Sequence, residues 1–143
     1  MSYAKIKPAV LQVELHPYLQ QHNLVRYAQS MGIHVTAFSP LGHGASYWKD
    51  EISTLREPIV QNLAKKHGVS EAQIVLRFGI ERGISVIPKS NNPGRIKQNI
   101  ELFEFKLSEE DMTQLYSLER NMRFNDPSIF CENVFNTFYP IFD

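Results

Sequence analysis

The feature that most constrains this chain is an alternation of short strand-like runs with helical patterns. Three apolar runs rich in β-branched residues each stop at turn residues, as buried strands do, and they cover 9–15, 33–39 and 84–87. When strands alternate with helices, the strands form a parallel sheet that crossover helices connect. The sequence therefore predicts an α/β fold with three parallel strands.

Helix signals lie between and after these runs. Helices are predicted over 24–31, 58–67, 71–82 and 93–99, with another that opens after Ser108. Gly32 and Gly68 follow two of them, where a helix often ends in a left-handed residue. Ser70 and Gln73 have the spacing of a capping box. In the first helix, the apolar stripe is Leu24, Tyr27, Ala28 and Met31, and the stretch 42–57 is interpreted as a long loop.

Three units of a strand and a helix cannot cover both faces and both edges of a parallel sheet. A chain of 143 residues has the size of one domain, whereas a closed (β/α)8 barrel needs eight strands and about 250 residues. We expect residues 1–143 to form a single partial domain, the C-terminal portion of such a TIM barrel. The βα units and the final helix would occupy 1–123, and a tail would occupy 124–143.

Composition excludes several other classes of protein. Fifteen Lys and Arg balance fifteen Asp and Glu, which argues against a nucleic-acid binder or a membrane-surface protein. No apolar run approaches the roughly 20 residues of a membrane helix. A single cysteine, Cys131, permits no internal disulfide, so we expect a reducing compartment, the cytoplasm. No metal-site motif is present, and no metal is expected.

Polar residues mark the carboxyl ends of the strands, where ligands gather in parallel α/β folds. Gln12, Glu14 and His16 share one face of the first strand. For Glu14 and His16 we favour a structural hydrogen-bond network over a ligand role, whereas Gln12 is the better ligand candidate because a carboxamide both donates and accepts. Phe38, at the end of the second strand, is either a core residue or a flat surface for a cofactor ring.

The loop after the third strand is the most informative stretch. Lys89 and Ser90 precede a predicted helix, and Arg95 falls in its first turn. Cations and a hydroxyl beside free helix N–H groups are typical of a phosphate clamp. A solvated basic loop is the alternative, and charge alone does not decide between them.

Four segments together carry a family resemblance: 8–18, 36–42, 86–90 and 121–127. In this order and spacing they resemble the aldo-keto reductases, and within them the aldose and xylose reductase group. The resemblance implies a (β/α)8 barrel that binds NADPH across its C-terminal face, in an enzyme that reduces aldehydes or aldoses.

The resemblance also implies roles for individual residues. Gln12 would hold the nicotinamide carboxamide, and Phe38 would stack on the nicotinamide ring where relatives usually have tyrosine. Ser39 and Leu41 would contact the pyrophosphate. The remaining contacts would come from the segment after the third strand: Lys89, Ser90 and Arg95 on the 2′-phosphate, Gln98 and Asn99 at the adenine, and Asn91 on the ribose hydroxyls if NADH is bound.

No catalytic residue is assigned, because the catalytic aspartate, tyrosine, lysine and histidine of the family match no position in this sequence. The tail would wall the pocket for a small aldehyde or sugar. The alternative to a reductase is a non-catalytic fragment that binds nucleotide or self-associates through open barrel edges. Neither nucleic acid nor a membrane is an expected partner.

Overall fold

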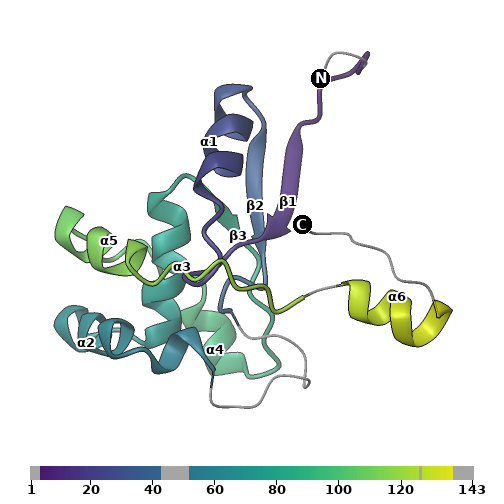
Figure 1. Cartoon of the computed structure of the whole chain (residues 1–143). Helices are drawn as coiled ribbons and strands as arrows, with labels where there is room; N and C mark the ends of the chain where they lie inside the picture. The colour runs from purple at the N-terminus through teal and green to yellow at the C-terminus, as the bar shows by residue number, and fades with distance from the viewer. Residues whose placement is uncertain (1–3, 43–51, 126, 137–143) are drawn as a thin grey trace.

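The computed structural model describes residues 4–42, 52–125 and 127–136. Within them, β1 (Val10–Glu14), β2 (His34–Phe38) and β3 (Ser85–Val86) form a parallel sheet in the order β1-β2-β3. The register sets Gln12 opposite Thr36 and Thr36 opposite Ser85. The predicted parallel α/β sheet is confirmed (Figure 1).

The connections and the segments that follow the sheet are mainly helical. They are α1 (His22–Ser30), η1 (Thr54–Arg56), α2 (Pro58–His67), α3 (Glu71–Glu81), α4 (Pro93–Gln98), α5 (Glu109–Tyr116) and α6 (Pro127–Phe135). Two elements differ from the prediction: the 3₁₀ helix η1 interrupts the expected loop 42–57, and α6 forms within the expected tail. Each helix in the described part of the chain is too short or too polar to traverse a lipid bilayer.

One face of the sheet is buried against α1. Val35, Ala37 and Ile84 pack there with Val25 and Ala28. The prediction for this helix is partly wrong, because Leu24 and Tyr27 are exposed and Val25 is buried instead. The helix carries two adjoining apolar stripes. Contact with the sheet decides which stripe is buried, and the spacing of apolar residues in the sequence does not show this.

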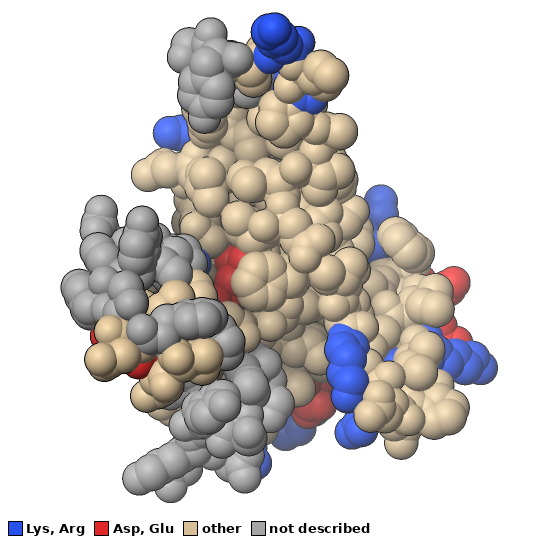
Figure 2. Space-filling view, turned by 90° about the vertical axis from the view of Figure 1, so that its right-hand side faces the viewer, with Lys and Arg blue, Asp and Glu red and all other residues tan. Residues whose placement is uncertain are grey.

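The described residues leave most of the opposite face of the sheet open. We call it the open face and define it by the exposed residues Val10, Gln12, His34, Ser85 and Ile87. Figure 2 shows that the surface on the β1 side has few charged side chains at its centre, whereas Lys and Arg lie toward the periphery. Parallel sheets are normally covered on both faces. A three-stranded parallel sheet with one bare face therefore has the character of a part of a larger sheet.

A second core joins α2, α3 and α5. Its fully buried members include Val60, Ile74 and Leu115. The two cores meet at α3, where a Cβ added to Gly79 would lie 2.7 Å from the Cγ1 of Val86. Glycine thus permits a close approach between α3 and β3. In Figure 1, α6 lies apart from α1–α5, beyond β1.

Candidate functional site

The parallel strands bring three of the predicted segments to one edge of the sheet. Gln12 is exposed on β1, and Phe38 is the half-buried last residue of β2. Beyond β3, the N–H of Ile87 donates to the carbonyl of Ala37 at 3.2 Å. The segment that leads to Lys89 therefore starts beside the end of β2.

The turn after β2 is held in a strained conformation. Ser39 has a φ of 47°, in the left-handed region that disfavours a residue with a side chain. The Nδ2 of Asn125 donates to its Oγ at 3.1 Å, and the N–H of Gly42 donates to its carbonyl at 2.9 Å. The carbonyl of Leu41 accepts a hydrogen bond from the Thr54 hydroxyl. These bonds fix the backbone of Ser39 and Leu41 at the sheet edge.

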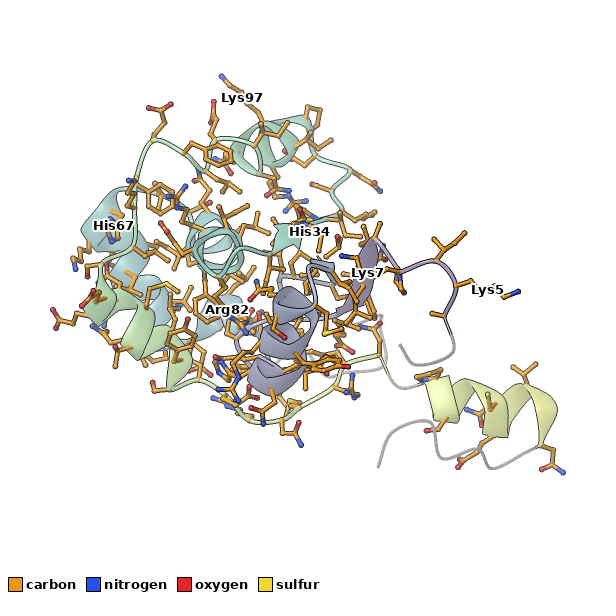
Figure 3. All side chains as sticks on the ribbon, turned by 90° about the horizontal axis from the view of Figure 1, so that it is seen from above. Lys5, Lys7, His34, His67, Arg82 and Lys97 are labelled. Atoms are coloured by element: carbon orange, nitrogen blue, oxygen red, sulfur yellow. The ribbon has the colours of Figure 1, made fainter. Side chains whose placement is uncertain are left out.

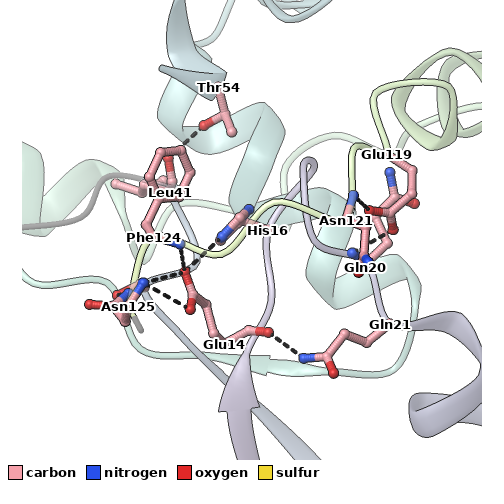
Figure 4. Close-up of polar contacts among 11 residues, drawn as sticks. Glu14, His16, Gln20, Gln21, Leu41, Thr54, Glu119, Asn121, Phe124 and Asn125 are labelled. Carbon is pink, nitrogen blue, oxygen red and sulfur yellow. Dashed lines mark hydrogen bonds and ion pairs between the residues drawn. The ribbon is translucent and has the colours of Figure 1, made fainter. Parts of the chain in front are cut away.

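Glu14 and His16 form the structural network that the sequence favoured (Figure 4). The Glu14 carboxylate is buried and accepts from the Nε2 of His16 at 3.0 Å, from the N–H of Phe124 at 2.8 Å and from the N–H of Asn125 at 3.2 Å. Burial alone would raise its pKa, but these hydrogen bonds outweigh burial and hold the pKa of Glu14 below its ordinary value. The carboxylate oxygens serve the fold, so Glu14 is not a ligand candidate.

The basic loop leads into α4 as predicted. The Asn92 side chain accepts from the N–H of Arg95 at 3.0 Å and so caps the helix, while the Ser90 Oγ accepts from the N–H of Asn92 at 3.2 Å. Lys89 and Arg95 are exposed, and neither pairs with a carboxylate in the described ranges. Two exposed cations thus lie close in sequence on one loop and helix.

The expected adenine contacts lie farther along the same helix. Gln98 is exposed, Asn99 is half-buried at the C-cap, and Asn91 is exposed in the loop before α4. The N–H of Asn99 donates to the carbonyl of Arg95 at 2.9 Å, which places them one turn apart. Among described residues, no hydrogen bond joins this group to Gln12, Phe38, Ser39 or Leu41. The predicted residues therefore fall into two groups that no described hydrogen bond joins.

The sequence did not identify two residues that order this edge of the sheet. Asn125 orders Ser39 from 86 positions away, and Thr54 orders Leu41 from 13 positions away. Neither bond follows from local spacing. The one available signal was Glu14, because a carboxylate in a buried strand requires donors that its own strand cannot supply. Residues 43–51 of the predicted long loop 42–57, and residues 126 and 137–143 of the predicted tail, lie outside the described residues.

Comparison with known proteins assigns the class. The model of the aldo/keto reductase family matches residues 1–120. The chain therefore belongs to the aldo/keto reductase family.

Individual relatives place the chain within this class. It is 49% identical over 131 residues to "Aldo-keto reductase family 1 member A1" of Bos taurus and 50% identical over 131 residues to the protein of that name in Mus musculus, each match covering 90% of the chain and 40% of the relative. It is 48% identical to "NADP-dependent D-sorbitol-6-phosphate dehydrogenase" of Malus domestica, over 90% of the chain and 42% of that protein. The chain thus spans about 40% of the length of these curated relatives.

Proposed function

We propose that this chain is the cofactor-holding C-terminal part of a (β/α)8 barrel in an NADPH-dependent reductase of aldehydes or aldoses. The observation that carries the proposal is the arrangement at the carboxyl edge of the sheet. Near that edge, the exposed carboxamide in β1 and the half-buried ring at the end of β2 lie on neighbouring strands, and two exposed cations follow β3. Membership of the aldo/keto reductase family and the open face of the sheet support it.

The residues present fit NADPH in their chemistry. Gln12 offers both a donor and an acceptor to the nicotinamide carboxamide. Phe38 presents an aromatic face to the nicotinamide ring, while the ordered turn at Ser39 and Leu41 would support the pyrophosphate. Lys89, with Ser90 and Arg95, would hold the 2′-phosphate, since a guanidinium and a phosphate form strong charge-assisted hydrogen bonds.

The other predicted contacts complete this assignment. Gln98 and Asn99 would reach the adenine, one helical turn beyond Arg95. Asn91 would bond the ribose hydroxyls of NADH, which lacks the 2′-phosphate. When bound, the cofactor supplies the hydride, and the protein's task is to bind it, orient it and exclude water.

The role of Arg95 is tested by cofactor binding. Arg95→Ala should weaken the binding of NADPH by about tenfold or more, since a hydrogen bond to a charged group contributes about 1.5–3 kcal/mol. NADH binding should stay nearly unchanged, because NADH has no 2′-phosphate. Isothermal titration calorimetry of the folded chain with both cofactors measures the difference.

A second cation on the same helix gives a matched control. The Nζ of Lys97 lies 3.6 Å from the Oε1 of Glu101, so this cation is paired within its own helix region. Lys97→Ala should therefore leave both cofactor affinities nearly unchanged. Equal losses for NADPH and NADH in Arg95→Ala would contradict the 2′-phosphate role. The folded chain's failure to bind either cofactor would overturn the proposal.

We propose no general acid in this chain, and we therefore expect the 143-residue chain alone to show no turnover. The test is NADPH oxidation with glyceraldehyde, on a sample whose fold is verified by circular dichroism. Turnover by the purified chain would mean that it carries its own proton donor, and this part of the proposal would be wrong.

A non-catalytic chain that binds nucleotide or self-associates is the second candidate. The open face favours it, because Val10 and Ile87 are each about half exposed on a parallel sheet. Cofactor binding without turnover and self-association fit both candidates, so they do not separate them. A coding segment for the other five βα units upstream would support the reductase over this candidate.

A further inference from the structure

A cavity of about 290 Å³ lies between α1, the end of α3 and α5. Its lining includes His22, Arg26, Gln29, Arg82 and Tyr116, none of which belongs to the candidate cofactor site. The side chain of Gln29 donates to the carbonyl of Arg82 at 2.9 Å, which ties α1 to the turn after α3. Figure 3 shows Arg82 beside α1. The cavity is thus a feature of the helical side of the molecule.

Arg82 is a half-buried cation that pairs with no carboxylate among the described residues. Its Nη2 donates to the carbonyl of Gln20 at 2.6 Å, and its Cζ lies 5.3 Å from the centre of the Phe78 ring and 6.0 Å from that of Tyr116. Across residues 4–42, 52–125 and 127–136, no ion pair of Arg82 is formed. Burial lowers the pKa of Arg82. Buried charges are normally paired, and a guanidinium has five N–H donors, of which the described residues accept one.

The carboxylate that influences Arg82 most directly is already engaged. Glu119 acts on Arg82 through space. Its Oε2 accepts from the N–H of Gln20 at 2.7 Å, and its Oε1 accepts from the N–H of Asn121 at 2.7 Å. Each oxygen thus accepts a backbone N–H, and Glu119 forms no ion pair with Arg82 among the described residues, which leaves guanidinium N–H groups of Arg82 for a further anion.

The other walls of the cavity suit an organic phosphate. Arg26 contributes a second guanidinium from the exposed side of α1. His22 and Tyr116 pack with ring centres 5.2 Å apart and form an aromatic wall. Two guanidinium groups match the two charges of a phosphate better than the single charge of a carboxylate.

We propose that this cavity binds a phosphate group, held by Arg82 and Arg26, with any attached organic group against His22 and Tyr116. The phosphate can be free or belong to a small phosphate ester. The site is separate from the cofactor residues, so it does not depend on the function proposed above.

The test is a titration of the 143-residue chain with inorganic phosphate, followed by NMR. The His22 imidazole signals and the Arg82 Nε–H signal should shift together and saturate at millimolar phosphate. Arg26→Gln should lower the phosphate affinity at least about fivefold, because one charge-assisted contact is lost. Arg95→Ala should leave these shifts unchanged.

The opposite results overturn the inference. If Arg95→Ala abolishes the binding and Arg26→Gln does not, the phosphate occupies the cofactor region instead. Signals of His22 and Arg82 that do not move at millimolar phosphate also exclude the site. Arg82 contributes to the fold, so the exposed Arg26 is the variant that decides, and unchanged phosphate affinity in folded Arg26→Gln contradicts the proposal.

The source of the phosphate can then be distinguished with phenyl phosphate. Tighter binding of phenyl phosphate than of inorganic phosphate, lost in Tyr116→Ala, indicates a phosphate ester. Equal affinity indicates a site for free phosphate, and the proposal then holds for that source.

Discussion

Gln12 and Glu14 lie two residues apart on the same face of β1, yet their surroundings differ completely. Gln12 is exposed and its amide is available to a ligand, whereas Glu14 is buried beneath residues 124 and 125. Alternation along a strand predicts the shared face but not the chain segment that covers one end of it. The depth of burial therefore separates Gln12, a proposed ligand contact, from the structural residue Glu14.

The structural role of Glu14 predicts a loss of stability in Glu14→Gln. The amide nitrogen of glutamine is a donor, and it would replace an oxygen that faces the N–H groups of residues 124 and 125. We expect the free energy of unfolding to fall by about 1–2 kcal/mol, measured by urea denaturation. The exposed Glu104→Gln is the control, and equal stability of the two variants would contradict the network.

The proposed stacking role of Phe38 predicts an effect on cofactor binding. Phe38→Ala should raise the dissociation constants of both NADPH and NADH by about three- to tenfold, because the stacking surface is lost. Phe38→Tyr keeps the ring and should change little. Fluorescence titration measures the affinities, and urea unfolding checks that the variant is folded. Unchanged affinity in folded Phe38→Ala would leave Phe38 as a core residue.

At the level of elements, Asp111 joins α5 to α2. Its carboxylate is fully buried and accepts from the Nζ of Lys66 at 2.7 Å, from the Nε2 of His67 at 2.8 Å and from the N–H of Ser108 at 3.1 Å. Burial would raise the pKa of Asp111, but the hydrogen bonds from Lys66, His67 and Ser108 lower it far more. Asp111 is thus both a cap of α5 and an anchor for the last turn of α2.

This lowered pKa predicts a pH dependence of stability. A carboxyl group whose pKa is lower in the folded state stabilises the fold above its ordinary value of 3.8, and this contribution is lost as the pH falls below that value. The free energy of unfolding of Asp111→Asn should be lower by about 2 kcal/mol at neutral pH. It should also depend less on pH between about 5 and 2. Thermal unfolding across this range measures both effects.

The control for this prediction is a neighbouring carboxylate. Glu110 is exposed in the same turn of α5, and Glu110→Gln should keep the pH dependence of the parent chain. An Asp111→Asn variant with the same acid profile as the parent chain would show that the link between α5 and α2 contributes little.

Helix boundaries were predictable where local chemistry sets them. Ser70 and Ser108 each form a capping box, and Gly68 ends α2 in the left-handed conformation. The 3₁₀ helix η1 and α6 were missed. The first depends on the Thr54 contact with Leu41, and the second combines β-branched and aromatic residues that favour strands.

The candidate site was predictable in part for the same reason. Strand pairing and alternation place Gln12 and Phe38 on one face of neighbouring strands, and the cap at Asn92 precedes Arg95 as its sequence spacing indicates. The bond from Asn125 to Ser39 spans 86 positions and has no local signature. Family resemblance supplied the roles of the individual residues, and these roles stay predictions.

At the scale of the whole molecule, we expect the open face and the outer edge of β1, which pairs with no described strand, to determine how the chain associates. A bare parallel sheet with few charges at its centre favours association. We expect the isolated chain to self-associate in a concentration-dependent manner, measured by light scattering after size exclusion. Val10→Lys should weaken this association, because it places a charge on the open face.

An exposed apolar residue outside the sheet provides the control. Ile100 is 71% exposed beyond α4, and Ile100→Lys should not alter the association. A parent chain that is monomeric at all accessible concentrations would contradict the role of the open face. Equal effects of both lysine variants would indicate nonspecific hydrophobic contact instead.

The bond between Glu14 and the N–H of Phe124 has a consequence for the order of folding. The two residues are 110 positions apart, so their contact closes one of the longest loops in the molecule. Closing a loop of this length costs about 4 kcal/mol in chain entropy. The local pairing of β1 with β2 can form early, whereas the burial of Glu14 is a late step. During synthesis on the ribosome, Glu14 therefore lacks its partners at residues 124 and 125 until these residues have left the exit tunnel.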